Sequence, residues 1–149
     1  MTSRTAVRAA TLVSECRRIK LKTVSDPRGH LTIAESGKEI PFSFARLFYV
    51  YGAAPGTRRG GHAHRTLSEF IVCLAGSVEV TVFDGRRRKR VTLHDPSVGI
   101  HIPPMIWIDV AIRSRGSVYL VIASAKYDEA DYIRDPAEFR AIVGRSLAR

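Results

Sequence analysis

The stretch RGGHAHRTLSEFIVCLAG, residues 59–76, holds the most informative pattern in the chain. Its HxH pair is His62 and His64, and four residues separate that pair from Glu69. Because residues two apart in an extended chain point to the same face, the two imidazoles lie on one side of a strand. The apolar run at residues 70–75 predicts a buried strand, with Glu69 at its entrance. Two imidazoles and a carboxylate directed toward one interior indicate a functional site.

Short strands separated by turns are expected on both sides of this stretch. Asp84-Gly85 lies between two β-rich runs, which is typical of a tight hairpin. Many short strands split by Gly, Pro and Asp turns favour an all-β fold, an antiparallel sandwich or barrel. A loop rich in Gly, Ala and Pro is expected over residues 52–61. Besides the HxH strand, the expected strands cover residues 17–24, 30–35, 44–51, 70–75, 77–83, 88–93, 99–102, 105–112 and 117–125.

The C-terminal segment has a helical pattern instead. Asp135 supplies an N-cap acceptor, Pro136 fits the first helical position, and Glu138 completes a capping box. One short helix is therefore expected over residues 136–147, packed on the barrel. Its apolar face carries Phe139, Ile142, Val143 and Leu147.

Length and composition describe an ordinary globular protein. The chain has 149 residues, of which 45% are hydrophobic, so one domain is the simplest organisation. We expect a loosely ordered lead-in over residues 1–15 and a single domain over residues 16–149. No apolar run is long enough to span a membrane, and the N-terminus lacks the apolar centre of a secretory signal. The two cysteines, Cys16 and Cys73, are expected to be unpaired thiols of a cytoplasmic protein.

The formal net charge of +10 raises the question of a polyanionic partner. Much of the excess lies in the N-terminal tail and in the run Arg86 to Arg90, directly after the Asp-Gly turn. A solvated hairpin tip accounts for that run. No aromatic residues interleave with it, as stacking on a single-stranded nucleic acid would require. Neither a nucleic acid nor a membrane is therefore expected as a partner.

The spacing of His62, His64, Glu69 and Gly76 resembles the first sequence motif of the cupin superfamily. A metal-binding cupin adds a histidine from a second motif, Pro-x-Gly-x-x-His, and Ile108 stands at that position here. A two-histidine, one-carboxylate site for a divalent transition metal remains open. The shortened ligand set favours a metal-free site, in which neutral imidazoles with a pKa of about 6.5 exchange protons at neutral pH. Alternatively, the three groups are satisfied polar residues of the core.

Several further segments resemble the sugar 3,4-ketoisomerases that act on dTDP-4-oxo-6-deoxyhexoses, the WxcM-like cupins. The resemblance covers about residues 17–143 and is most specific at YDEADYIR, residues 127–134. It implies a cupin-type antiparallel jelly-roll barrel, a homodimer with exchanged N-terminal strands, a dTDP-linked 4-oxo-6-deoxy sugar as substrate, and no metal or other cofactor. The matching segments are residues 28–31, 40–42, 46–49, 59–64, 73–77, 95–99, 123–124 and 127–134.

The reaction that this resemblance implies moves a ketone from C4 to C3 of the sugar through an enediol. His62 is implied as the base that takes the C3 proton, and His64 as the group that assists the oxygens or positions the sugar. Arg46 and Arg59 match family positions whose charge suits pyrophosphate or enediolate oxygens. Surface or interface ion pairs are the alternative for these two arginines.

The other residues expected to bind the substrate differ in the contacts that they can make. Glu69 can orient one imidazole, and Trp107 can stack on thymine or the sugar unless it is a core aromatic. The chain departs from the family pattern at Phe48, His101 and Ile108, where a hydroxyl-bearing aromatic, a tyrosine and a histidine are common. These departures keep open a non-catalytic cupin that binds a nucleotide sugar. The two histidines and Glu69 keep open a second alternative, a metal-dependent small cupin enzyme. The expected substrate-binding set is Arg46, Arg59, Tyr49, Trp107, His101 and Glu69.

Overall fold

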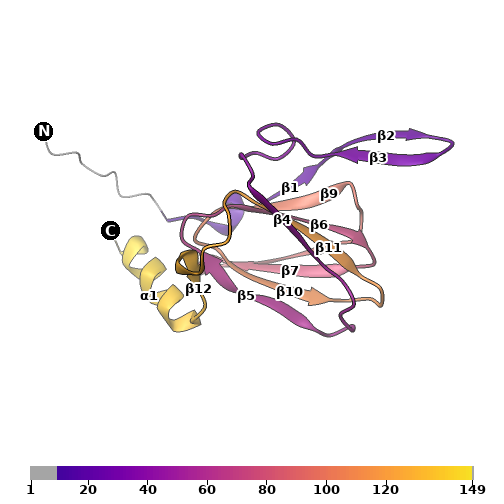
Figure 1. Ribbon diagram of the computed structural model, residues 1–149. Coiled ribbons are helices and arrows are strands. Elements are labelled where there is room, and N and C mark those ends of the chain that lie inside the picture. Colours follow the sequence, from indigo (N-terminus) through magenta and orange to yellow (C-terminus); the bar gives the residue numbers. More distant parts are fainter. Residues whose placement is uncertain (1–9, 149) are drawn as a thin grey trace, which may run out of the picture.

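Two antiparallel five-stranded sheets face each other in the computed structural model, which describes residues 10–148 (Figure 1). The expected all-β jelly roll with a short C-terminal helix is thereby confirmed. Sheet one consists, in spatial order, of β1 (Arg17–Lys20), β9 (Val98–Ile102), β6 (Glu69–Ala75), β11 (Val118–Ala123) and β4 (Arg46–Val50). Sheet two consists of β12 (Tyr132–Ile133), β5 (Arg58–His64), β10 (Trp107–Ile112), β7 (Val78–Phe83) and β8 (Arg88–Leu93).

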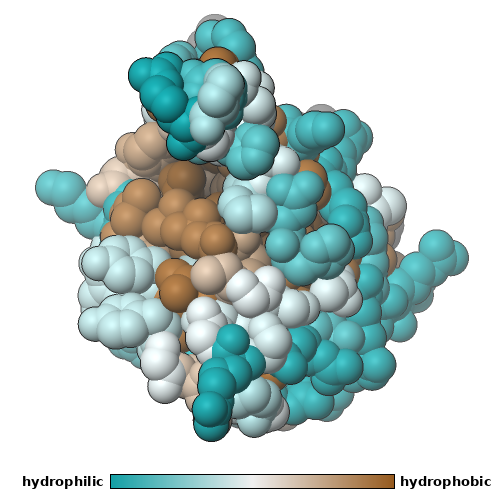
Figure 2. All heavy atoms as spheres, turned by 90° about the vertical axis from the view of Figure 1, so that its right-hand side faces the viewer, coloured by the Kyte–Doolittle hydropathy of each residue, from teal (hydrophilic) through white to brown (hydrophobic). Residues whose placement is uncertain are grey.

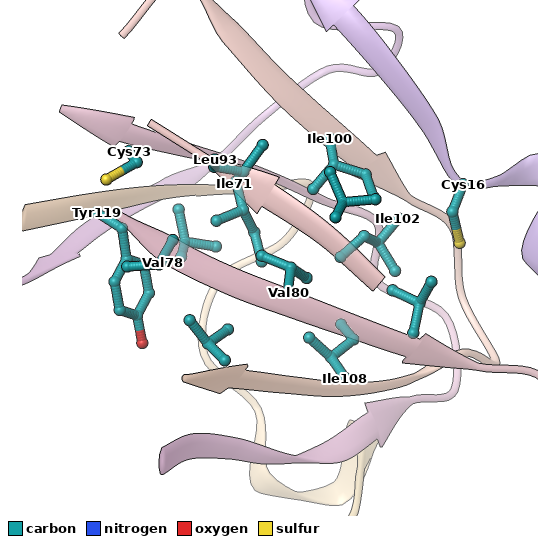
Figure 3. Packing of buried hydrophobic residues seen from close by; sticks show 14 of the residues in the cluster. Cys16, Ile71, Cys73, Val78, Val80, Leu93, Ile100, Ile102, Ile108 and Tyr119 are labelled. Atoms are coloured by element: carbon teal, nitrogen blue, oxygen red, sulfur yellow. The ribbon is translucent and has the colours of Figure 1, made fainter. Parts of the chain in front are cut away.

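Side chains that alternate along the strands fill most of the space between the sheets. In β7 every second residue is buried, as expected for a strand with one face in a core. β6 is instead buried on both faces over its first five residues, because its outer side packs beneath the segment around Ile40. The inward residues of the central core include Ile71, Cys73, Val78, Val80, Leu93, Ile100, Ile102 and Ile108 (Figure 3).

The N-terminal part of the chain differs from the single strand expected over residues 17–24. It forms two strands, because Leu21 is buried and its backbone N–H donates to the Ser97 carbonyl oxygen at 2.7 Å. Beyond Leu21, β2 (Lys22–Asp26) leaves sheet one and pairs with β3 (Gly29–Ile33) in a projecting hairpin (Figure 1). All residues of β2 are exposed, so this strand contributes no side chain to the core.

The C-terminal helix α1 (Pro136–Leu147) has the predicted bounds. Asp135 is its N-cap and accepts a hydrogen bond from the Ala137 N–H. Glu138 does not act in the predicted capping box but binds Arg65 across the surface at 2.8 Å. The helix covers one end of the outer face of sheet two, where its apolar residues pack into a cluster of Ala63, Trp107, Ile133, Phe139 and Val143.

Asp84 connects the predicted hairpin to the lead-in. The Asp84-Gly85 turn joins β7 to β8, as predicted. The Asp84 carboxylate also accepts a hydrogen bond from the Val13 N–H at 2.9 Å. Val13 is buried and begins the 3-10 turn η1 (Val13–Glu15). Of the expected lead-in, residues 1–9 lie outside the described part of the chain.

Three smaller expectations concern a loop, the cysteines and the membrane. β5 begins at Arg58, so the loop expected over residues 52–61 ends earlier than predicted. Cys16 and Cys73 are buried, unpaired thiols, and burial raises the pKa of Cys16 to about 12. Such a thiol stays protonated and unreactive at neutral pH. No helix within residues 10–148 has the length and hydrophobicity to cross a membrane.

Candidate active site

A bulge in β5 sets the direction of the histidine pair. The register between β5 and β10 shifts between Ile108 and Asp109, opposite Gly60 and Gly61. Both glycines have positive φ angles, +82° and +70°, and a Cβ on Gly60 would lie 2.7 Å from the Ile108 carbonyl oxygen. Glycine fits this conformation and this contact without strain, whereas other residues do not. The Gly-Gly pair is therefore the local reason why His62 turns toward the space between the sheets.

His62 presents an unpartnered nitrogen to a cavity. Its Nε2 is buried and has no hydrogen-bond partner among residues 10–148. The side chain lines a cavity of about 330 Å³ between the two sheets. Burial lowers the pKa of His62 and outweighs the opposing effect of the Glu69 charge, because desolvation penalises the imidazolium. The ring is therefore neutral at neutral pH, the form that accepts a proton.

His64 is held between two carboxylates. Its Nε2 lies 3.0 Å from Oε1 of Glu69, and its Nδ1 lies 3.2 Å from Oδ2 of Asp131. Both contacts are hydrogen bonds at once only if the ring donates through both nitrogens or one carboxyl group carries a proton. In each case both nitrogens of His64 are engaged. The ring meets that of His62 edge-on, with ring centroids 4.9 Å apart.

Asp131 is itself held by the chain that follows the HxH pair. Thr66 donates to Oδ1 through its backbone N–H at 2.8 Å and through its hydroxyl at 2.7 Å. Leu67 N–H donates to Oδ2 at 3.3 Å. Burial opposes ionisation, but the hydrogen bonds from Thr66 overcome it and lower the pKa of Asp131. His64 thus packs against a carboxylate that is ionised at neutral pH and fixed in place.

Both sheets contribute walls to the cavity. Glu69, Arg59 and Tyr49, which were expected near the substrate, line it together with His62. Tyr49 is 59% exposed on the edge strand β4 and shares its outward face with Leu47, so it borders the cavity only at the solvent edge. Other residues on the walls include Phe48, Ile71, Ile108, Tyr119, Tyr132 and Arg134.

Arginines surround one side of this cavity. Nη2 of Arg46 donates to the hydroxyl of the lining residue Tyr132 at 3.3 Å, while Nε of Arg46 is buried and has no partner among the described residues. The Arg134 guanidinium lies 4.3 Å from the centroid of the Tyr132 ring and pairs with Glu129 at 2.6 Å. Together with Arg59, these side chains create positive surroundings that suit an anionic ligand.

Two of the expected substrate-binding residues lie away from the cavity. Trp107 is buried beneath α1, with its ring centroid 5.6 Å from that of Phe139, so it occupies the core position that was the alternative for this residue. His101 lies on the outer side of sheet one, with its ring 5.6 Å from that of Phe42. It lines a separate groove with Arg17. The structure therefore does not bring these two residues together with His62.

Four residues of the site were not singled out from the sequence. Asp131, Tyr132 and Arg134 belong to the segment YDEADYIR, whose resemblance to the family was noted without assigning roles to its members. Tyr119 is 3% exposed and alternates with the other inward residues of β11. From the sequence it is indistinguishable from a core aromatic, and only the fold places it on the cavity wall.

The fold and the cavity define a class of protein, the small jelly-roll proteins of the cupin type. Within that class, the family model described as "FdtA: WxcM-like, C-terminal" matches residues 14–144. The chain therefore belongs to the WxcM-like FdtA family, and the resemblance noted from the sequence is confirmed.

Named relatives of this chain are sugar isomerases. The TDP-4-oxo-6-deoxy-α-D-glucose-3,4-oxoisomerase of Aneurinibacillus thermoaerophilus is 38% identical over 127 residues, 85% of this chain and 91% of the relative. The sugar 3,4-ketoisomerase QdtA of Thermoanaerobacterium thermosaccharolyticum, solved with TDP, has a TM-score of 0.86 at 35% identity, with coverage of 90% of this chain and 98% of QdtA. A 3,4-ketoisomerase of Helicobacter canadensis has a TM-score of 0.85 at 36% identity, with coverage of 87% and 98%.

Proposed function

We propose that this chain is a dTDP-sugar 3,4-ketoisomerase, which moves the keto group of a dTDP-4-oxo-6-deoxyhexose from C4 to C3 in deoxysugar biosynthesis. The observation that carries the proposal is the unpartnered Nε2 of His62 at the wall of an internal cavity. Membership of the family and the name of the Aneurinibacillus relative support the type of reaction. A variant of QdtA was solved with TDP-4-keto-6-deoxyglucose, which supports the class of substrate.

In the proposed mechanism, His62 acts on the carbon atoms. It takes the proton from C3 while the C4 carbonyl oxygen gains a proton, and the result is a neutral enediol. A proton then returns from His62 to C4, and the C3 hydroxyl loses its proton as it becomes the new ketone. No electrons leave the sugar. Both nitrogens of His64 are engaged by Glu69 and Asp131, and its ring packs edge-on against that of His62. In this proposal His64 therefore positions the base rather than acting as one.

Arginines hold the nucleotide diphosphate in this proposal. Arg59 lines the cavity, and Arg46 has a buried Nε that lacks a partner among residues 10–148. A guanidinium binds phosphate oxygens through several N–H donors at once. Tyr49 extends the binding surface toward solvent.

We also propose that the reaction takes place in the cytoplasm, since the unpaired thiols Cys16 and Cys73 suit a reducing compartment.

The direct test is incubation of the purified protein with dTDP-4-oxo-6-deoxyglucose in D₂O, followed by NMR of the sugar. A 3-oxo product with deuterium at C4 is expected. Binding of dTDP without product or deuterium incorporation would instead support the non-catalytic binding protein. The absence of both dTDP binding and turnover would contradict the proposal.

We further propose that the chain works as a homodimer with exchanged N-terminal strands. Val24 and Leu31, cross-strand partners of the projecting hairpin, are 51% and 60% exposed. On the outer side of sheet one, Leu47 and Leu74 are also exposed. Figure 2 shows apolar atoms gathered in a hollow area below the hairpin. Exposed apolar surface of this kind is typical of a protein interface, and a second copy of the chain supplies a matching hairpin.

Light scattering on the purified protein tests the dimer. The Leu31→Asp variant places a charge on the apolar side of the hairpin and is expected to yield monomers. Thr32→Asp is the matched control, because Thr32 pairs with Thr23 on the opposite side. A wild-type monomer, or equal effects of the two variants, would contradict the exchanged arrangement.

A metal-dependent small cupin enzyme is the second candidate. The potential ligand atoms of His62, His64 and Glu69 all lie within 4.8 Å of one another, which favours it. Against it, Glu69 and His64 bind each other, and Ile108, the cross-strand partner of His62, has no ligand atom. Stoichiometric Fe, Mn or Zn in the purified protein, with activity lost on chelation, would replace the metal-free proposal.

A further inference from the structure

Transfer of a ketone between adjacent carbons also requires proton transfer between the two oxygens. One oxygen must gain a proton as its carbonyl becomes a hydroxyl, and the other must lose one. A group that does both must be able to donate and accept, which a hydroxyl can do. His62 is already assigned to the carbon atoms, so the cavity must supply this group from another side chain.

Three tyrosines line the cavity, and they differ in what is available to a substrate. Tyr49 is 59% exposed, so water competes for its hydroxyl. Tyr132 is only half-buried, and its hydroxyl accepts a hydrogen bond from Arg46. Tyr119 is 3% exposed, so its hydroxyl is the one that is held away from bulk water.

Tyr119 reaches the cavity from the centre of sheet one. On β11 it lies opposite Val50 of β4 and Cys73 of β6. Figure 3 shows it at the edge of the core cluster, with its hydroxyl directed away from β11 toward the strands of sheet two. Sheet two carries both Arg59 and His62 on β5. The hydroxyl and the imidazole therefore approach one cavity from opposite sheets.

The surroundings of Tyr119 suit a phenol that exchanges its proton and recovers it. Burial raises the pKa of Tyr119, and the charge of Arg59, together with its hydrogen bond to the phenol, opposes that shift. The resting side chain is therefore a neutral phenol, which can donate. Arg59 stabilises negative charge on the oxygen during the exchange.

We propose that Tyr119 is a catalytic residue of the isomerisation that relays the proton between the two sugar oxygens. Its O–H bond breaks as the proton passes to the C4 oxygen, and a new O–H bond forms as it takes the proton of the C3 hydroxyl. His62 takes the C3 hydrogen as a proton and returns a proton to C4. The phenol and the imidazole thus end as they began, and the assignment rests on the proposed function.

Phe48 offers a second position for the same hydroxyl. It pairs with Val121, which lies two residues from Tyr119 along β11. Phe48 and Tyr119 are therefore diagonal neighbours on one face of sheet one, within reach of aromatic side chains. Both line the cavity. A tyrosine at position 48 can direct a phenol into the cavity from the adjacent strand.

The first test is Tyr119→Phe, which removes one oxygen and keeps the ring. We expect kcat to fall about 100-fold, as for loss of a proton-transfer group, with KM within about threefold. Exchange of the C3 hydrogen with D₂O should fall less than turnover, because His62 still reaches the carbon. The matched control is Tyr51→Phe, since Tyr51 is 70% exposed and outside the cavity lining. It should turn over like the wild type.

The second test moves the hydroxyl. Phe48→Tyr in the Tyr119→Phe background should recover at least about tenfold in kcat. A Tyr119→Phe enzyme within about threefold of wild type would overturn the assignment, as would a raised KM with unchanged kcat. Equal losses of exchange and turnover without rescue would also overturn it. If the wild-type enzyme does not turn over the substrate, the proposed function fails together with this inference. If the wild type and Tyr119→Phe turn over at the same rate, only this inference fails.

Discussion

The space between the two sheets has two halves, filled in different ways. The half bounded by β7, β8 and β9, the packed half, is filled by aliphatic side chains. The half bounded by β4, β5 and β12, the cavity half, contains a cavity of about 330 Å³. Two buried nitrogens, His62 Nε2 and Arg46 Nε, lack hydrogen-bond partners among residues 10–148 and belong to the cavity half. Members of the packed half include Val78, Val80, Val91, Leu93, Ile100 and Ile102, all at most 2% exposed.

This difference indicates which half supplies stability and which supplies chemistry. An aliphatic side chain in a close-packed core contributes through contacts on all sides. A buried polar atom without a partner costs about 1–3 kcal/mol, and a ligand that supplies the partner recovers that free energy. Substitutions in the packed half should therefore lower stability, while substitutions in the cavity half should lower activity.

The largest expected effect is on activity, from His62→Asn. Loss of a general base typically reduces the rate by about 10²- to 10⁴-fold, and Asn keeps a polar side chain of smaller size in the cavity. The free energy of unfolding should change little, because Nε2 of His62 has no partner to lose among the described residues. Steady-state kinetics and urea unfolding measure the two quantities. His94→Asn, at an exposed position, is the matched control, and activity within about tenfold of wild type would show that the base is another group.

The next largest effect is on stability rather than activity, from Ile100→Ala in the packed half. Ile100 is 0% exposed, and truncation of a buried isoleucine to alanine costs about 2–5 kcal/mol through lost burial and the cavity that remains. Urea unfolding should show that loss, while kcat of the folded fraction stays near the wild-type value. A large fall in kcat at full folding would mean that the two halves are coupled.

Gly60→Ala tests the junction at which β5 enters the cavity half. A Cβ there would lie 2.7 Å from the Ile108 carbonyl oxygen, in a backbone conformation with φ +82°. We expect a loss of about 1–3 kcal/mol from backbone strain and, because the bulge directs His62, a fall in kcat. Gly116→Ala is the control, since its φ is +74° and no atom lies within 4 Å of its added Cβ. Equal effects of the two variants would assign the loss to φ alone and not to the contact.

The packed half could be predicted from the sequence far better than the cavity half. Period-two alternation and the Asp84-Gly85 turn depend on neighbouring residues, so the strands, the hairpin and α1 were found near their true bounds. The departure of β2 from sheet one was missed, because the burial of Leu21 depends on Ser97 far along the chain. Local patterns cannot contain such long-range contacts.

The same limit explains which site residues were found. His62 and His64 carry their signal in a two-residue spacing, whereas Asp131 meets His64 from 67 residues away. Trp107 and Tyr119 are both aromatic residues in apolar strands, so their patterns look alike. Only the packing of the sheets directs Trp107 beneath α1 and Tyr119 to the cavity wall.

The smallest expected effect is on the pH dependence of stability, to which the aliphatic side chains of the packed half contribute nothing. Burial lowers the pKa of folded His62 below the ordinary value of 6.5. Below that pH the unfolded chain binds a proton that the folded chain does not, so the free energy of unfolding falls as pH decreases, by at most about 1.4 kcal/mol per pH unit. Urea unfolding of His62→Asn between pH 7.5 and pH 5.5, at about unit intervals, should therefore show a shallower slope than the wild type.

Burial also lowers the pKa of His101. Part of the slope should therefore persist in His62→Asn, and His101→Asn should remove a separate part. An unchanged slope in His62→Asn would mean that the imidazole is not desolvated, and the contrast between the two halves would then rest on packing alone.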